Sequence, residues 1–102
     1  MRTALPWLAA IALAPPIAPA HAQSDMQRAR DLAASCSNCH GTAGRAQGQL
    51  PVLAGQPKAD IVSKLNDFRD GKRPATIMHQ LAKGYTPDQI DMIAGWFSQQ
   101  KP

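Results

Sequence analysis

The chain has 102 residues, a formal net charge of +4 and two cysteines. This length accommodates one small domain at most. Acidic residues are interspersed with the basic ones, which argues against the clustered basic stripe of a nucleic-acid binder. Two cysteines alone cannot supply a four-sulfur zinc or iron–sulfur site.

The N-terminal segment has the features of a secretory signal. Arg2 is followed by an apolar run from Leu5 to Leu13 and by the small-x-small sequence of residues 20–22. These features predict a signal peptide over residues 1–22 and a mature domain over residues 23–102, exported to the periplasm. The apolar run is too short for a convincing transmembrane helix, so we expect no stable membrane insertion after cleavage. An uncleaved anchor is the alternative.

A first helix is expected from about Asp25, a suitable N-cap, to the cysteine motif. Apolar residues recur at helical spacing: Met26, Ala29, Leu32, Ala33 and Cys36. The small side chains among them would let another helix approach closely.

The sequence Cys36-Ser-Asn-Cys39-His40 is the attachment signature of a c-type haem. Each thiol adds across one haem vinyl group, and one helical turn brings both sulfurs to the same porphyrin edge. His40 then stands below the iron as its proximal ligand. A thioredoxin-like redox pair would need a βαβ context that is not visible, and a plain structural disulfide needs no histidine at this position.

Residues 41–49 contain three glycines and predict a loop that leads to Pro51. An iron-bound histidine normally donates its far N–H to an acceptor that fixes the ring. The backbone carbonyl near Pro51 is one candidate for this acceptor. The alternative is that Pro51 only shapes the loop.

A second helix is expected to open at Gln56-Pro57, with the proline at its first position, and to end at Gly71. A short helix from Thr76 to Lys83 should then carry the second iron ligand. Met78 lies far enough after His40 for the chain to reach the opposite face of the haem. Its rivals are His79, which is expected on the surface, then Met92 and Met26.

The last helix starts at a capping box formed by Thr86 and Gln89, with proline between them at the first helical position. Its apolar stripe comprises Ile90, Ile93, Ala94 and Phe97. Gly95 in the helix interior predicts a close crossing with the small residues of the first helix. No strand pattern appears, so the expected fold class is all-α.

The order of these elements resembles a bacterial class I cytochrome c: three main helices and a short methionine-bearing helix wrapped around one covalent haem c. Three segments, residues 51–56, 67–73 and 74–80, are similar to the haem domains of the cytochrome subunit of flavocytochrome c sulfide dehydrogenase. The resemblance implies thioethers at Cys36 and Cys39, with His40 and Met78 as the axial ligands. Many relatives carry two such domains, whereas this chain has one haem motif, and Ala29 stands where a glycine is common.

The resemblance implies a non-enzymatic carrier of single electrons and, more specifically, the cytochrome subunit of a sulfide-oxidising flavocytochrome c with a flavoprotein partner. The alternatives are a freely diffusing carrier to an oxidase or reductase, and a haem-based sensor or peroxidase-like protein with a labile distal ligand. The expected docking face has an apolar part, Ile77 and Ala82. Its cationic rim comprises Lys72, Arg73 and Lys83.

Overall fold

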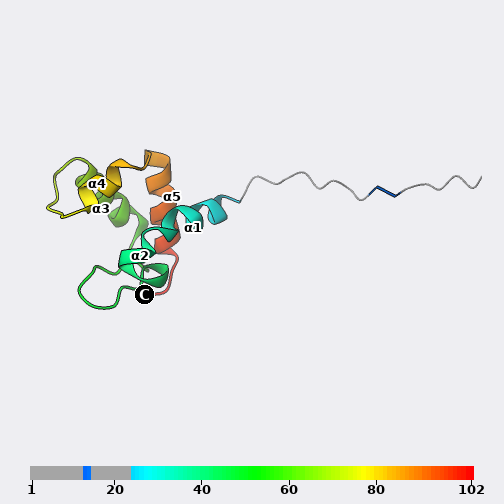
Figure 1. Cartoon of the computed structure of the whole chain (residues 1–102), viewed down its shortest axis with the longest axis horizontal. Coiled ribbons are helices and arrows are strands. Elements are labelled where there is room, and N and C mark those ends of the chain that lie inside the picture. The colour runs from blue at the N-terminus through cyan, green and yellow to red at the C-terminus, as the bar shows by residue number, and fades with distance from the viewer. Residues whose placement is uncertain (1–12, 15–23) are drawn as a thin grey trace, which may run out of the picture.

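The computed structural model describes residues 13–14 and 24–102, so the predicted signal peptide lies almost entirely outside the described residues. Within the described part all regular structure is helical, as Figure 1 shows, which confirms the expected all-α class. The elements are α1 (Asp25–Ala34), α2 (Ser37–His40), the 3₁₀ turn η1 (Thr42–Gly44), α3 (Lys58–Arg69), α4 (Met78–Lys83) and α5 (Pro87–Ser98). None of these described helices has the length and apolar character needed to cross a bilayer.

Helices α1 and α5 pack against each other and form the centre of the fold (Figure 1). From α1, Ala29 and Ala33 are buried, and their short side chains bring the two backbones close together. The buried residues of α5 are those of the predicted stripe: Ile90, Ile93, Ala94 and Phe97. The predicted core face of α5 is therefore correct. That of α1 is correct at its centre, where Ala29 and Ala33 are buried, and wrong at its start, where Met26 is 47% exposed.

Helix α3 packs against both α5 and α4, and it thereby joins the methionine-bearing segment to the rest of the fold. Ile61 of α3 is 3% exposed and Ala82 of α4 is fully buried. Gly71 ends the α3 segment with a φ of +73°, in the left-handed conformation that glycine adopts without strain. The N–H of the next residue, Lys72, donates to the carbonyl of Asp67 at 2.8 Å, which caps the helix end.

The capping box of α5 is present as expected. The Thr86 hydroxyl accepts from the N–H of Gln89 at 3.2 Å, and the Gln89 amide oxygen accepts from the N–H of Thr86 at 2.9 Å. At α1 the expected cap is wrong by one residue, because the Ser24 hydroxyl accepts from the N–H of Gln27 at 3.2 Å. Asp25 instead occupies the first turn, where its charge favours the helix dipole.

The two middle helices also begin later than expected. Pro57 has a ψ of 135°, so it precedes α3 as the N-cap and the first helical residue is Lys58. Helix α4 begins at Met78 rather than at Thr76, because Ile77, its N-cap, has a non-helical φ of −133°.

The protein part alone provides a small core. Among residues 13–14 and 24–102, nine apolar residues are buried: Ala29, Ala33, Ala54, Ile61, Ala82, Ile90, Ile93, Ala94 and Phe97. Five of the nine are alanine, which buries little apolar surface. A domain of this size ordinarily needs an additional source of burial, such as disulfides, a metal or a large bound group.

The predicted contact between Gly95 and the first helix is wrong. A Cβ atom at this position would lie 3.7 Å from Cε of Lys58, at the start of α3, and not against α1. This is an ordinary van der Waals distance, so the position has room for a methyl group. Close approach of α1 and α5 therefore depends on the alanines of α1 and on Ala94.

We predict that Gly95→Ala stabilises the protein by about 1 kcal/mol, because alanine lowers the entropic cost of ordering the helix. Chemical unfolding of the haem-loaded protein measures this change. Gly44→Ala is the contrasting variant: Gly44 has a φ of +77°, and an added Cβ would lie 2.7 Å from the Phe97 ring. Gly44→Ala should lower the free energy of unfolding. A loss of stability in Gly95→Ala would contradict the conclusion that position 95 has room for a methyl group.

Candidate haem-binding site

The two cysteines lie on the single turn that follows α1. The N–H of Cys36 donates to the carbonyl of Ala33 at 3.0 Å, and the N–H of His40 donates to the carbonyl of Cys36 at 2.9 Å. These bonds extend the helical geometry through the motif, so the thiols at i and i+3 share one face. Cys36 is half-buried beside the core, Cys39 is exposed, and both thiols are free.

The partial burial of Cys36 changes its acid–base behaviour. Desolvation raises the pKa of the Cys36 thiol, and the Ser35 hydroxyl, which hydrogen-bonds it, opposes this effect to a smaller extent. At neutral pH the group is therefore a protonated thiol rather than a thiolate. It is held against apolar side chains, where the edge of a porphyrin would also be accommodated.

The ring of His40 is fixed by the loop that follows it. Its Nδ1 lies 2.8 Å from the carbonyl oxygen of Pro51, so Nδ1 carries the proton and donates it. The lone pair of Nε2 is then available to a metal, and the donated hydrogen bond increases its basicity. This is the contact that the sequence suggested for Pro51.

The loop is itself anchored, which holds the Pro51 carbonyl in place. The N–H of Leu53 donates to the carbonyl of Gly44 at 2.8 Å, closing the loop across η1. The side chain of Gln56 donates to the Val52 carbonyl and accepts from Lys64 of α3 at 2.8 Å. Loop and α3 therefore position the histidine together.

Met78 is the first residue of α4 and is half-buried. The sequence predicts its neighbour His79 on the surface, and this prediction is wrong. It is half-buried, and its Nδ1 is buried without a hydrogen-bond partner among the described residues. Position alone thus does not remove His79 as a rival ligand.

The distribution of exposed apolar side chains fits a bound haem. Six large apolar side chains are exposed in the described part: Leu13, Met26, Leu50, Val52, Ile77 and Leu81. Leu50 and Val52 adjoin Pro51 in the chain and Ile77 adjoins Met78, while Leu81 lies further along α4. An apolar plate between the Pro51 loop and α4 would cover such side chains and enlarge the small core. No group of three or more His, Cys, Asp or Glu residues in the described part is arranged to hold a metal ion.

Two features of the site were not anticipated from the sequence. Ala82, expected on a docking face, is fully buried against α3 and is not available to a partner. The hydroxyls of Ser35 and Tyr85 lie 3.0 Å apart, although the residues are 50 positions apart in the chain. No local pattern indicates a pair at this separation.

Comparisons with known proteins agree with this geometry. A family model for cytochrome c matches residues 26–101. The chain is 40% identical over 70 residues to the cytochrome subunit of sulfide dehydrogenase from Chlorobaculum tepidum, covering 69% of this chain and 64% of that protein. It is 34% identical to cytochrome c-554(548) from Halomonas halodenitrificans, covering 76% of this chain and 98% of that protein.

Among solved structures, cytochrome c4 from Acidithiobacillus ferrooxidans aligns with a TM-score of 0.63 and 32% identity. The alignment covers 70% of this chain and 49% of that one, so this chain spans about half of the cytochrome c4 chain. The chain belongs to the cytochrome c family. This domain has the class I cytochrome c fold of electron-transfer proteins, and its cofactor is a covalently bound haem c.

We predict that Met78→Ala lowers the reduction potential and opens the iron to cyanide or carbon monoxide, because a thioether opposite histidine favours the reduced iron. Redox titration and absorption spectra of the haem-loaded protein measure both effects. Met92→Leu is the control, since Met92 lies on α5 and should contribute only packing.

The reverse result, with the methionine–iron absorption lost in Met92→Leu and kept in Met78→Ala, would contradict the assignment. The buried nitrogen of His79 makes one further variant necessary. If His79→Ala rather than Met78→Ala alters the axial-ligand spectrum, the iron has two histidine ligands.

Proposed function

We propose that Cys36 and Cys39 form the two thioethers of the haem, with His40 as proximal ligand and Met78 as distal ligand. The observation that carries this assignment is the hydrogen bond between His40 and Pro51, which leaves Nε2 of the ring free. A histidine with only a packing role would not need a closed loop to orient its Nε2 in this way. The exposed apolar side chains beside Pro51 and Met78 support the same arrangement.

We infer that residues 1–22 are a signal peptide and that residues 23–102 form the mature periplasmic domain. Haem is attached to thiols outside the cytoplasm, so the motif and the N-terminal sequence support each other. Removal of Arg2 with the signal leaves ten basic and seven acidic residues, a net charge of +3.

The haem, when bound, supplies one-electron chemistry through the ferrous and ferric states of its iron. The residues of the chain perform the remaining tasks. The half-buried Cys36 holds one porphyrin edge against the core, and Pro51 keeps His40 in one tautomer and orientation. A neutral thioether from Met78 favours the reduced iron and raises the potential.

We propose that this carrier serves as the cytochrome subunit of a sulfide-oxidising flavocytochrome c, with a flavoprotein as its redox partner. The 40% identity to the Chlorobaculum tepidum sulfide dehydrogenase subunit supports this role. So do the similar segments 51–56, 67–73 and 74–80, which contain the candidate ligand Met78 and the supports of His40. The apolar part of the docking face is Ile77, which is 56% exposed. The cationic rim is Lys72, Arg73 and Lys83, all exposed.

A freely diffusing carrier is the second candidate function. The observation in its favour is the match to cytochrome c-554(548), which the alignment covers over 98% of its length. The described fold is thus nearly the whole of one relative, whereas it is 64% of the sulfide dehydrogenase subunit.

We predict that the mature protein begins at or near Gln23 and carries one haem that acidified solvent does not extract. Intact-mass measurement on protein from a host with cytochrome maturation should give the mass of residues 23–102 plus one haem. Cys36→Ala and Cys39→Ala should each lower the yield sharply, because each removes a thioether and weakens the anchoring of the core. A mass equal to that of the bare chain would refute covalent attachment.

We predict that a free carrier would show electron-transfer rates that fall steeply with salt, because its cationic rim steers a transient encounter. A stable subunit would co-elute with its flavoprotein at high salt, with the apolar contact carrying most of the affinity. Stopped-flow reduction by candidate partners over a salt series separates the two. Lys72→Glu/Lys83→Glu should weaken the salt dependence of a carrier.

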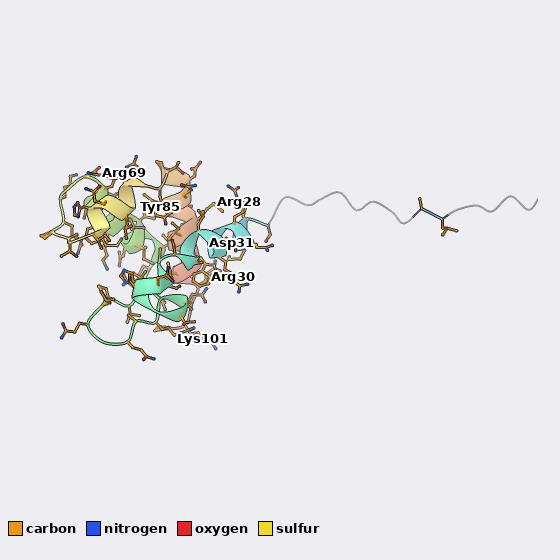
Figure 2. The ribbon with its side chains drawn as sticks, viewed as in Figure 1. Arg28, Arg30, Asp31, Arg69, Tyr85 and Lys101 are labelled. Atoms are coloured by element: carbon orange, nitrogen blue, oxygen red, sulfur yellow. The ribbon has the colours of Figure 1, made fainter. Side chains whose placement is uncertain are left out.

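The matched control is Arg30→Glu/Lys101→Glu, which changes the net charge by the same amount. Figure 2 shows both of these residues far from α4. If both double variants slow transfer equally, only net charge matters. If neither variant nor salt affects transfer to any partner, the proposed docking face is wrong.

A further inference from the structure

One long-range contact connects the haem-attachment turn to the segment that carries Met78. The hydroxyls of Ser35 and Tyr85 share a hydrogen bond at 3.0 Å. Ser35 closes α1 and directly precedes Cys36. Tyr85 is the single residue between Gly84, the C-cap of α4, and Thr86, the N-cap of α5, and Figure 2 shows it at this junction.

Both ends of this contact are held by their surroundings. On one side, Ser35 is continuous with the hydrogen-bonded turn that runs from Cys36 to His40. On the other side, the Tyr85 ring packs against the main core cluster, and its N–H lies 3.4 Å from the carbonyl of Ala82. A displacement of the α4–α5 junction would therefore break or stretch the bond between the two hydroxyls.

We infer that Tyr85 is a positioning residue for the distal ligand. Its hydroxyl holds the C-terminal end of α4 at a fixed place relative to the turn that attaches the haem. Because α4 has six residues, a shift at its end is transmitted to Met78 at its start. The Ser35–Tyr85 hydrogen bond thereby keeps the methionine sulfur within reach of the iron and limits replacement of the sulfur by other ligands.

This inference rests on the proposed role of Met78, and the two are tested separately. The first measurement is the methionine–iron absorption of the wild-type ferric holoprotein. If this band is absent, the ligand assignment fails and the positioning role fails with it. If the band is present, the role of the Ser35–Tyr85 hydrogen bond is tested by substitution.

The test substitution is Tyr85→Phe, which removes the hydroxyl and keeps the ring that packs on the core. The probe is imidazole, which binds ferric iron only after the methionine sulfur has left. Loss of one ordinary hydrogen bond should raise the apparent imidazole affinity about two- to tenfold. It should also weaken the methionine–iron band. Ser35→Ala should give the same direction of change, and the double variant should add little to either single one.

The control is Ser24→Ala, which removes the N-cap hydrogen bond of α1 at the end remote from Cys36. It should lower the melting temperature and leave both the imidazole affinity and the band unchanged. If the control raises imidazole affinity as much as Tyr85→Phe at equal loss of stability, Tyr85 has only a structural role. Unchanged imidazole affinity and band in Tyr85→Phe would likewise overturn the inference.

Discussion

The shortage of apolar side chains in the core is the constraint on which this fold depends. In the described part of the chain, four residues larger than alanine are less than a tenth exposed: Ile61, Ile90, Ile93 and Phe97. Apolar burial is the main favourable term in folding, and small domains lack the volume to supply it alone. A covalent haem c would supply that surface, and side chains such as Leu50 and Ile77, which the protein leaves about half exposed, would be available to contact it. Burying the remaining half of each would contribute about 1 kcal/mol per side chain.

The same constraint explains why the loop after His40 is so closely held. A cofactor that serves as core must have a fixed orientation, since the helices pack around it. Gly41 and Gly44 have φ values of +84° and +77°, which let the chain reverse directly after the motif and return Pro51 to the histidine. At Gly44 the Phe97 ring also occupies the space that a Cβ would need, so this turn is packed onto α5. The loop that positions His40 and the packing of η1 onto α5 therefore form one structural unit.

Predictions that rest on neighbouring residues are the most accurate. The capping box at Thr86, the stripe of α5 and the left-handed Gly71 all depend on residues within a few positions of one another. The His40–Pro51 contact could also be predicted from the sequence, because an iron-bound histidine needs a hydrogen-bond acceptor for its second nitrogen and the loop after His40 is short. Errors arose where the outcome depends on tertiary placement. The partner of Gly95 is Lys58 rather than α1, Ala82 is buried by α3, and the nitrogen of His79 is enclosed.

The two sides of the haem are supported in different ways, and this difference determines which residues control the redox properties. On the proposed proximal side, Cys36, Cys39 and His40 belong to one helical turn, so local backbone structure fixes their relative positions. On the proposed distal side, Met78 begins a six-residue helix that is too short to be stable by itself. Its place depends on the burial of Ala82 against α3 and on the connection to α5 through Tyr85. Substitutions in these supports should therefore alter the ligand and the potential before they unfold the protein, whereas substitutions around the attachment turn should affect haem incorporation itself.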